Sequence, residues 1–283
     1  MVEQAAQLKK SVETPPLDLE APDDKPRGIV RRLLRMLHDL VDFVGEVTLL
    51  AGQAFGSILH GGFEMRDLIN QMASIGVDSV WIVLIITGAT GAVFAFYIAT
   101  LTSQFGSGFN QFLGGTVGYS FLNELGPTLG GVGLAARSGA AIAAEIGSMV
   151  VTEQVDALRA MAVSPVRYLV VPRVLAAVIM LPLLTALADI AGLFGGYVFS
   201  LGTGVSGEAF WTSVHTYTKV SDLLHGLLKS VVFGFLIGVV ACQQGLRTKG
   251  GATGVGRATT SSVVLCVVLI FITDFFLAQI LTR

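Results

Sequence analysis

The sequence predicts an all-α integral membrane protein, in which an N-terminal interfacial amphipathic helix precedes five transmembrane helices. Hydrophobic residues make up 53% of the 283 residues and charged residues 13%, and the mean hydropathy is +0.73. Soluble domains carry about 25% charged residues. This chain has too few charges to cover a water-facing surface, so lipid must cover most of it. The formal net charge of −2 gives no indication of a nucleic-acid partner.

The N-terminal region has two parts of different character. Residues 1–27 place prolines among acidic residues and lysines, which predicts a disordered cytoplasmic tail. In residues 28–60, apolar side chains recur three or four positions apart, the period of a helix with one apolar face. This stretch is too charged to span, so we expect an interfacial helix, with packing on the protein's own flank as the alternative. Three arginines would then lie at anionic head groups: Arg31, Arg32 and Arg35.

Residues 61–283 contain five apolar runs, and a helix of about 20 residues crosses the hydrocarbon core. The predicted spans are residues 77–102, 113–148, 168–201, 224–245 and 258–281. Polar links are expected between them, at 103–112, 149–167, 202–223 and 246–257. The first spanning run begins near Val77, too late for a cleavable signal peptide.

Basic residues indicate the orientation of the spans. One set of flanks holds most of them: Arg27 to Arg35, Arg66, Arg159, Arg167, Arg173, Arg247, Lys249 and Arg257. The other set holds Lys219 and Arg283, with Lys229 slightly inside a span. The positive-inside rule makes the first set cytoplasmic. Five spans then place the N-terminus in the cytoplasm and the C-terminus outside.

Small residues recur at four-residue steps within several spans. They are Ala188, Gly192 and Gly196; Gly234 and Gly238; and Gly126 and Gly130. Such steps let helix backbones approach closely in lipid, although they do not identify the partner helix.

The sequence gives no support for a catalytic centre. Residues 245–250 have the glycine spacing of a phosphate loop, but Gly251 stands where the lysine is required. Residues 131–136 match a dinucleotide fingerprint loosely, inside an apolar helix where tight packing is the better interpretation. Cys242 and Cys266 are expected to be small buried hydrophobes. The four histidines have no metal-ligand spacing, so we expect neither an enzyme nor a bound metal or cofactor.

Charged residues inside the spans are more informative, because a charge in hydrocarbon costs about 2.5–3.5 kcal/mol even on lenient scales. Structural pairing is the simplest expectation, between Arg137 and Glu145 and between Lys229 and Asp274, with contact to a substrate as the alternative. Glu124 differs, because it precedes Gly126 and Pro127, where the sequence predicts a helix break. Unwound backbone at membrane depth must face protein or a wet cavity, so Glu124 is expected to line a transport cavity.

Residues 151–162 predict a short charged helix on the cytoplasmic side. Thr152 is placed to cap it, Val155, Leu158 and Ala162 form a narrow apolar stripe, and Pro165 ends it. A solvated connector between two spans is one interpretation. The other is a docking surface for a soluble partner, formed by Glu153, Gln154, Asp156 and Arg159.

Several motifs resemble the MlaE/YrbE permease family. They are Asn-Glu-Leu-Gly-Pro at 123–127, Ala-Arg-Ser-Gly at 136–139, Ala-Glu-Ile-Gly-Ser-Met at 144–149, Thr-Glu-Gln at 152–154, Met-Ala-Val-Ser-Pro at 161–165, Pro-Arg at 172–173, Leu-Pro-Leu-Leu-Thr at 181–185, Phe-Trp at 210–211, Lys-Ser-Val-Val-Phe at 229–233 and Arg-Ala-Thr-Thr at 257–260. The resemblance runs from about residue 30 to the C-terminus.

The resemblance implies the permease subunit of an ABC transporter in the bacterial inner membrane, moving phospholipid or a related lipid. It further implies a homodimer, ATPase subunits that bind ATP and Mg, a periplasmic ring of an MCE-domain protein and, often, a STAS-domain protein. Residues 151–162 would be the coupling helix. A lipid cavity at the dimer axis would include Asn123, Glu124 and Tyr97. The Gram-negative phospholipid members have Arg-Glu where this chain has Asn123-Glu124, so the cationic head-group contact is missing.

Two other functions fit parts of the sequence. One is an ion-coupled secondary carrier that uses Glu124, Asp189 and Asp274 as a relay, although no inverted repeat is visible. The other is a non-transporting membrane anchor for an MCE protein.

Overall fold

The computed structural model describes residues 29–59, 65–105, 112–203 and 205–281, and the regular structure in these ranges is helical. The chain divides into two compact units, residues 1–45 and 46–283. The predicted disordered tail, residues 1–27, lies outside the described residues, as do the side chains of Arg31, Arg32 and Arg35. The interfacial placement of these arginines therefore stays a prediction.

Helix α2 (Ile29–Leu59) occupies the region where the sequence predicts an amphipathic helix. In the first unit, His38 Nε2 lies 3.6 Å from Asp42 Oδ2, one turn along the helix. In the second unit, Leu50 and Ala54 are buried. Glu46 Oε2 lies 3.3 Å from Arg247 Nε and accepts a hydrogen bond from Gln243 Nε2 at 2.8 Å. The second half of α2 therefore packs on the protein's own flank.

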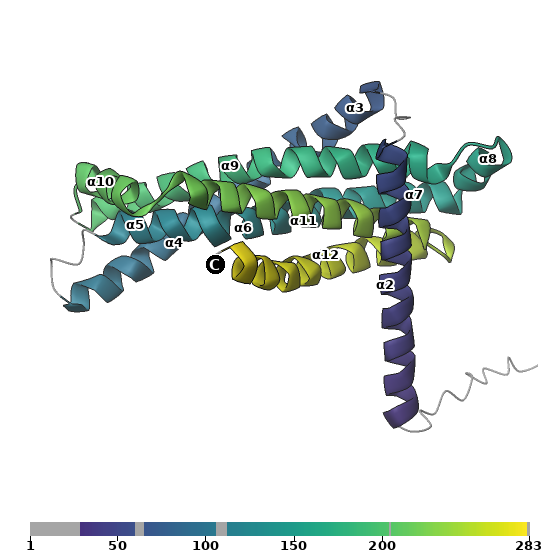
Figure 1. Ribbon diagram of the computed structural model, residues 1–283, viewed down its shortest axis with the longest axis horizontal. Helices are drawn as coiled ribbons and strands as arrows, with labels where there is room; N and C mark the ends of the chain where they lie inside the picture. Colours follow the sequence, from purple (N-terminus) through teal and green to yellow (C-terminus); the bar gives the residue numbers. More distant parts are fainter. Residues whose placement is uncertain (1–28, 60–64, 106–111, 204, 282–283) are drawn as a thin grey trace, which may run out of the picture. The chain divides into compact units, whose positions relative to one another are not determined.

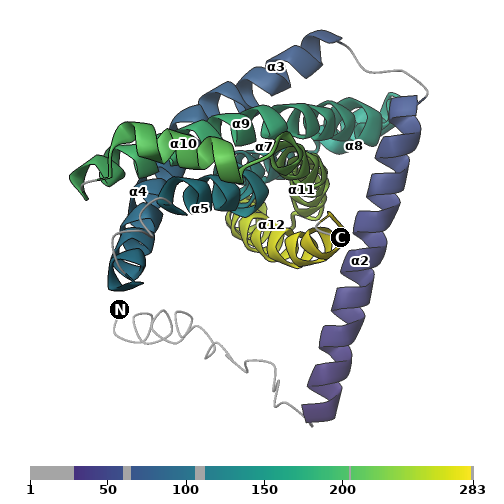
Figure 2. The same ribbon diagram turned by 60° about the vertical axis from the view of Figure 1, so that its left-hand side comes forward.

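Five helical segments are long and apolar enough to cross a membrane, as the sequence predicts (Figures 1 and 2). The first contains α3 (Met65–Ile75), η1 (Val77–Ser79) and α4 (Val80–Phe105), and the second runs from α5 (Leu113–Ser120) to Val151. The third contains η5 (Val166–Val170) and α9 (Val171–Gly202). The fourth and fifth are α11 (Val220–Leu246) and α12 (Gly251–Leu281).

The second span is a continuous helix in which α-helical and wider π-helical turns alternate. After α5 come the π-helical turn η3 (Phe121–Leu125), α6 (Gly126–Leu134), the π-helical turn η4 (Ala135–Gly139) and α7 (Ala140–Val151). The predicted helix break at Pro127 is therefore wrong. A proline lacks an N–H and its ring clashes with the carbonyl four residues earlier. The extra residue in η3 relieves this conflict, and the Gly126 N–H bonds the Phe121 carbonyl instead.

The third span repeats this arrangement. The π-helical turn η5 ends at Val170, and Pro172 follows two residues later, just as Pro127 follows η3. The N–H of Val171 donates to the Val166 carbonyl, five residues back. In both spans a widened turn lets the chain continue as a helix through a proline.

Helix α9 lies at the centre of the bundle, and glycines bring α4 against it. A Cβ atom added at Gly91 would overlap the backbone of Gly192, and one added at Gly195 would overlap the backbone of Gly88. Backbone contact of this kind maximises dispersion between helices when lipid offers no hydrophobic driving force. The predicted step through Gly192 thus contacts α4 at Gly91, and it also contacts Phe121 of η3, whose ring an added Cβ at Gly192 would overlap.

The other two small-residue steps lie on α11 and α6, and both face α9. On α11, Gly234 lies against the backbone of Ala177, and Gly238 lies against Val174. On α6, Gly130 faces Thr185, with a distance of 3.5 Å between the Thr185 Oγ1 atom and the position of an added Cβ. One predicted step therefore lies on α9, and the other two pack against it.

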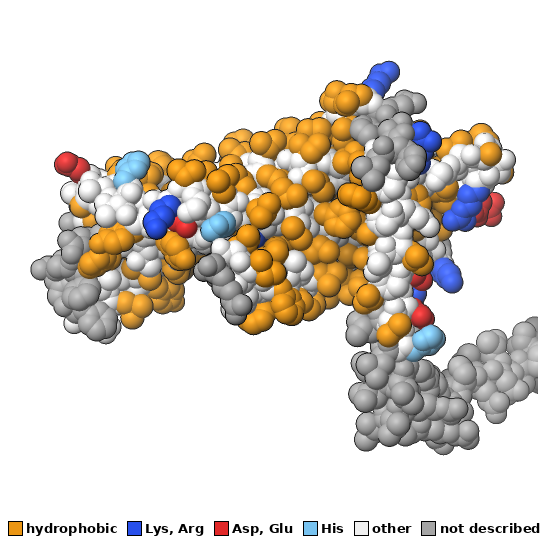
Figure 3. Space-filling model, in the orientation of Figure 1, with side chains coloured by type: hydrophobic (Ala, Val, Ile, Leu, Met, Phe, Trp, Pro, Cys, Tyr) orange, Lys and Arg blue, Asp and Glu red, His pale blue; other side chains and the backbone are white. Residues whose placement is uncertain are grey.

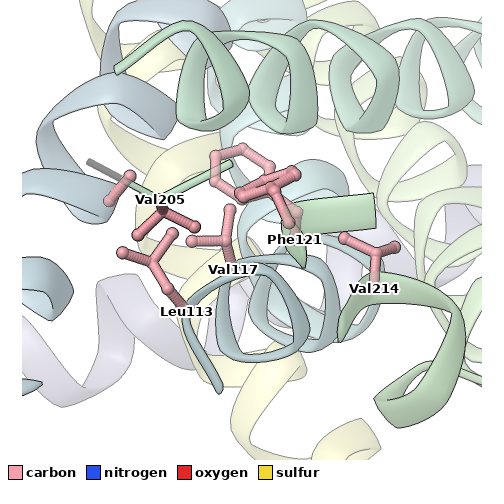
Figure 4. Packing of buried hydrophobic residues seen from close by; sticks show 7 residues of the cluster. Leu113, Val117, Phe121, Val205 and Val214 are labelled. Carbon is pink, nitrogen blue, oxygen red and sulfur yellow. The ribbon is translucent and has the colours of Figure 1, made fainter. Parts of the chain in front are cut away.

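Helix α10 (Gly207–Tyr217) lies in residues 202–223, which the sequence predicts to be a polar link between two spans. Ser206 caps it by accepting a hydrogen bond from the Ala209 N–H at 3.2 Å. Its apolar side joins α5 in a buried cluster (Figure 4), which comprises Ala95, Leu113, Val117, Phe121, Val205, Phe210 and Val214. The sequence reading missed this helix because it is too short to span.

The distribution of charge over the second unit matches a protein surrounded by lipid. Figure 3 shows hydrophobic side chains over the middle of the bundle, with charged side chains towards the end that carries α8 and towards the end that carries α10. Large apolar side chains such as Trp81 and Ile85 on α4, and Phe275 and Ile280 on α12, are more than half exposed. Lipid can cover these side chains, as the composition predicts.

The glycine contacts with α9 lead to a first prediction. Replacing Gly91 with Ala should lower the free energy of unfolding by about 1–3 kcal/mol, because the added methyl group meets backbone that cannot move aside. Thermal unfolding in detergent measures the effect. The matched control is Gly256→Ala, where nothing lies within 4 Å of the added Cβ. Equal behaviour of the two variants would contradict close packing at Gly91.

Candidate functional site

Three charged residues from three different spans meet inside the bundle. Lys229 Nζ on α11 lies 2.6 Å from Glu124 Oε2 on η3 and 3.0 Å from Asp274 Oδ1 on α12. The side chain of Lys229 is 2% exposed and that of Asp274 is 17% exposed, whereas that of Glu124 is 41% exposed. One ammonium group is shared by two carboxylates, and solvent or ligand reaches the cluster mainly through Glu124.

The wide turn η3 positions Glu124 in this cluster. Pro127 has no N–H to offer the Leu122 carbonyl, which lies five residues earlier. This carbonyl lies against Gly226 of α11, where an added Cβ would overlap it. The same close approach between η3 and α11 brings Glu124 to Lys229, three residues beyond Gly226. The sequence predicts the pair of Lys229 with Asp274, but it gives no sign that Glu124 joins them.

The other two predicted cavity residues are arranged differently. Asn123 is buried, and its Nδ2 donates to the Tyr119 carbonyl of the preceding turn at 3.1 Å. Tyr97 is 61% exposed on α4, where its ring packs edge-on against Phe96. Of the three predicted residues, only Glu124 belongs to the charged cluster, and the roles of Asn123 and Tyr97 stay predictions.

The expected pair between Arg137 and Glu145 does not form. These residues lie eight positions apart on one helix, a rise of about 12 Å, which is too far for their side chains to meet. Arg137 instead binds Asp78 at 2.9 Å and donates to the Ser74 carbonyl at 2.7 Å. Glu145 Oε2 lies 3.0 Å from Arg173 of the next span.

The contacts of Arg137 and its neighbour complete the end of α3. Arg137 bonds the carbonyl of Ser74, and Ser138 Oγ bonds the carbonyl of Ile75 at 3.1 Å. These are carbonyls of the last turn of α3, which the helix itself leaves without donors. The Ala-Arg-Ser-Gly motif at 136–139 therefore ties the second span to the junction between α3 and α4.

Asp189 on α9 stands apart from these pairs. Its side chain is buried, and neither carboxylate oxygen has a hydrogen-bond partner among the described residues. Gly126 packs directly on this carboxyl group, since an added Cβ there would overlap Asp189 Oδ1. The described ion pairs do not link Asp189 to Glu124 or Asp274, which share Lys229 instead.

The short charged helix is α8 (Gln154–Ala160), seven residues rather than the predicted 151–162. Thr152 does not cap it, because its hydroxyl donates to the Ser148 carbonyl of α7. Glu153 takes the N-cap position in a left-handed conformation, with a φ of 60°. The chain thus turns sharply at Glu153, and α8 runs in a new direction from α7 (Figure 1).

The end of α8 also differs from the prediction. The helix stops at Ala160, and Ala162 adopts a positive φ of 59°. Pro165 begins the next span instead of ending α8, which suits a proline because the first helical N–H has no partner to lose. Of the predicted apolar stripe, Val155 is buried, Leu158 is half-buried and Ala162 is exposed.

Helix α8 presents polar side chains to solvent. Arg159 NH1 lies 2.8 Å from Asp156 Oδ1, and these side chains are 64% and 69% exposed. Gln154 Nε2 donates to Thr152 Oγ1 at 3.0 Å, and Glu153 is exposed. All four residues predicted as a docking surface therefore lie at the surface of one protruding helix. Their role as a docking surface remains a proposal.

The described residues offer no group of three His, Cys, Asp or Glu side chains that could hold a metal ion. The fold and the site therefore define a multi-pass α-helical membrane protein with a buried charge cluster and a protruding charged helix. Residues 68–280 match the family described as Permease MlaE. The chain belongs to this family.

Named relatives agree with this assignment. A probable ABC transporter permease protein of Synechocystis, slr1045, is 42% identical over 233 residues, which cover 82% of this chain and 88% of that protein. RT0041 of Rickettsia typhi, with the same description, is 37% identical over 88% of this chain and all of that protein. The chloroplastic protein TRIGALACTOSYLDIACYLGLYCEROL 1 of Arabidopsis thaliana is 36% identical over 82% of this chain and 66% of that protein. This protein is accordingly a permease subunit of an ABC transporter.

The charge cluster leads to a second prediction. Lys229→Met should lower the free energy of unfolding by about 3–5 kcal/mol, because it leaves two carboxylates facing each other without their buried counter-ion. Adding Glu124→Gln and Asp274→Asn should restore part of the loss. Chemical unfolding in detergent measures both effects.

The control is Arg159→Met, which breaks the exposed pair with Asp156 and should cost less than about 1 kcal/mol. If Lys229→Met lowers the free energy of unfolding as little as Arg159→Met does, the buried cluster does not stabilise the fold as proposed.

Proposed function

We propose that this permease subunit moves phospholipid or a related lipid between the inner membrane and an MCE-domain partner, and that a separate ATPase drives it. The cluster of Glu124, Lys229 and Asp274 carries the proposal. Apolar spans surround it, yet one of its carboxylates is 41% exposed. A polar contact inside apolar walls is what a lipid requires, with the head group at the charges and the acyl chains along the spans.

The composition of the cluster favours a head group that carries both signs or several hydroxyl groups. Glu124 can accept hydrogen bonds from an ammonium or hydroxyl group, and Lys229 behind it can attract a phosphate. Asn123 adds no charge, and its amide group bonds its own helix. The Arabidopsis relative is named for trigalactosyldiacylglycerol, a lipid whose head group is uncharged. This name supports a lipid substrate without requiring a cationic contact at position 123.

The proposed orientation places α8 in the cytoplasm and α10 in the periplasm. Arg159, Arg167, Arg173, Arg247 and Lys249 lie in or near the links at the α8 end, as the positive-inside rule requires of a cytoplasmic face. At the α10 end, a groove of about 450 Å³ is lined by polar side chains that include Ser206, Glu208 and Thr212. We propose that this end meets the MCE ring.

A homodimer would close the lipid cavity. Helix α12 is the span least covered by its own chain, with 11% of its most apolar stretch buried, compared with 50% for α11. The same helix supplies Asp274 to the charge cluster. A second copy would therefore shield Glu124 from bulk lipid, and the two cavities would face a common axis.

Helix α8 is the proposed contact with the ATPase, which would bind ATP and Mg. A STAS-domain protein joins the ATPases in our proposal. The sharp turn at Glu153 separates α8 from α7, and the five residues 161–165 join α8 to η5, where the third span begins. A push on α8 would therefore be transmitted along α7 and α9, which lead towards the charge cluster and Asp189.

The docking role leads to a third prediction. Exchanging the two charges, Asp156→Arg with Arg159→Asp, preserves the ion pair but reverses its direction. It should weaken binding of the ATPase by about 2–5 kcal/mol, because each exchanged side chain would then face a like charge of the partner, and like charges repel. Charge reversal at Glu153 and Asp156 together should likewise uncouple ATP hydrolysis from lipid transfer. Affinity measurements and transfer between vesicles test both.

Glu208→Lys serves as the control, since it reverses an exposed charge on α10 at the other end of the molecule. It should leave the ATPase affinity unchanged. Normal ATPase binding by the exchanged pair would refute the docking role of α8.

Lipid binding at the cluster leads to a fourth prediction. Mass spectrometry of the purified permease should detect bound lipid. Glu124→Gln keeps the side-chain shape but removes the charge, and should lower the affinity for lipid about tenfold, the value of one charge-assisted hydrogen bond. Glu208→Gln should have no effect. Absence of lipid from the wild-type protein, with an MCE protein still co-purifying, would instead indicate a membrane anchor.

A further inference from the structure

Asp189 is the least satisfied charged residue in the described part of the chain. It lies in the middle of α9 with 3% of its surface exposed, and both carboxylate oxygens are buried without a hydrogen-bond partner among the described residues. Thr185, one turn earlier on the same face, is fully buried, and its hydroxyl oxygen is also without a described partner. Two buried polar side chains without hydrogen-bond partners, in the middle of a membrane-spanning helix, are candidates for a functional role.

The packing around Asp189 is tight. Gly126 of α6 lies directly on the carboxyl group, and Gly130, one turn further, lies opposite Thr185. The two glycines therefore stack on the two polar side chains where α6 crosses α9. Since even a methyl group at Gly126 would overlap Asp189 Oδ1, a hydrated metal ion cannot fit on this side of the carboxyl group.

The ion pairs in the described part of the chain include none to Asp189, so these residues supply no counter-ion for a negative charge there. Helix α6 carries no ionisable residue, and α4 carries only Tyr97, which is 61% exposed. The nearby charges on η3 and α11, Glu124 and Lys229, bind each other. A buried carboxylate without a counter-ion is strongly unfavourable, and such a group becomes neutral by taking up a proton.

We propose that Asp189 is a proton-binding positioning residue for the lipid site. Its carboxyl group carries a proton in the packed state, and the neutral group lets α9 lie on Gly126. Because Gly126 directly follows η3, this contact fixes the turn that presents Glu124. Ionisation of Asp189 would favour separation of α6 from α9 and would shift Glu124. The positioning role rests on the proposed lipid function, whereas the bound proton does not.

Infrared difference spectroscopy tests the proton directly. The spectrum of the detergent-solubilised wild-type protein minus that of Asp189→Asn, both at neutral pH, should contain the carbonyl stretch of a protonated carboxylic acid. The control is Glu124→Gln, whose spectrum should retain this band. A difference spectrum that contains only carboxylate bands would overturn the proposal. The measurement needs neither lipid nor ATPase, so it is independent of the proposed function.

Lipid-stimulated ATP hydrolysis by the complex with the ATPase tests the positioning role. Asp189→Asn, a neutral side chain of the same shape, should behave like the wild type. Gly126→Ala should raise the lipid concentration for half-maximal stimulation about tenfold, because the methyl group would push α6 off Asp189 and so displace η3 and Glu124. Asp189→Ala combined with Gly126→Ala should recover most of this loss, because it makes room for the methyl group.

The outcomes distinguish the positioning role of Asp189 from the proton that it is proposed to bind. If Asp189→Asn impairs stimulation as much as Gly126→Ala, the neutral form is not the active one and the positioning role is refuted. If Gly126→Ala keeps wild-type stimulation, the contact with Asp189 does not position Glu124. If lipid fails to stimulate the wild type, the proposed lipid function is at fault, and the infrared band still decides whether Asp189 holds a proton.

Discussion

Close backbone contact along α9 holds the membrane-spanning helices of this protein together. In lipid there is no hydrophobic gain from bringing two apolar helices together, so attraction must come from closely packed atoms. Glycines on α4, α6 and α11 each bring their helix against α9. Because three helices meet one helix at glycines, their relative depth is fixed, and the charged residues that they carry are brought into register.

The widened turns provide the second element of the arrangement. A proline within a span would normally leave backbone groups without partners, which is costly where no water can bind them. The turns η3 and η5 absorb Pro127 and Pro172 without a break. At η3, the displaced backbone lies against Gly226, and this contact aligns Glu124 with Lys229. The irregularity required by a proline is therefore also what builds the charge cluster.

The two ends of the molecule are joined through the same helices. Helix α8 lies between α7 and α9, and both lead from the charged end to the middle of the bundle. Arg173 pairs with Glu145 near this end, which ties the third span to the second. Rigid helices with paired charges transmit a displacement, whereas flexible links would absorb it. These features support a mechanical connection between α8 and the proposed lipid site.

The fold class, the five spans, the amphipathic α2 and a short charged helix at α8 could be predicted from the sequence, because these depend on hydropathy, period and length along the chain. The sequence also identified the charged residues inside the spans. The sequence does not show which of these residues meet. Arg137 binds Asp78 rather than Glu145, and Lys229 binds Glu124 as well as Asp274, because partners are set by helix packing. The continuous helix at Pro127 and the lone carboxyl of Asp189 depend on backbone contacts between distant segments, which no local pattern records.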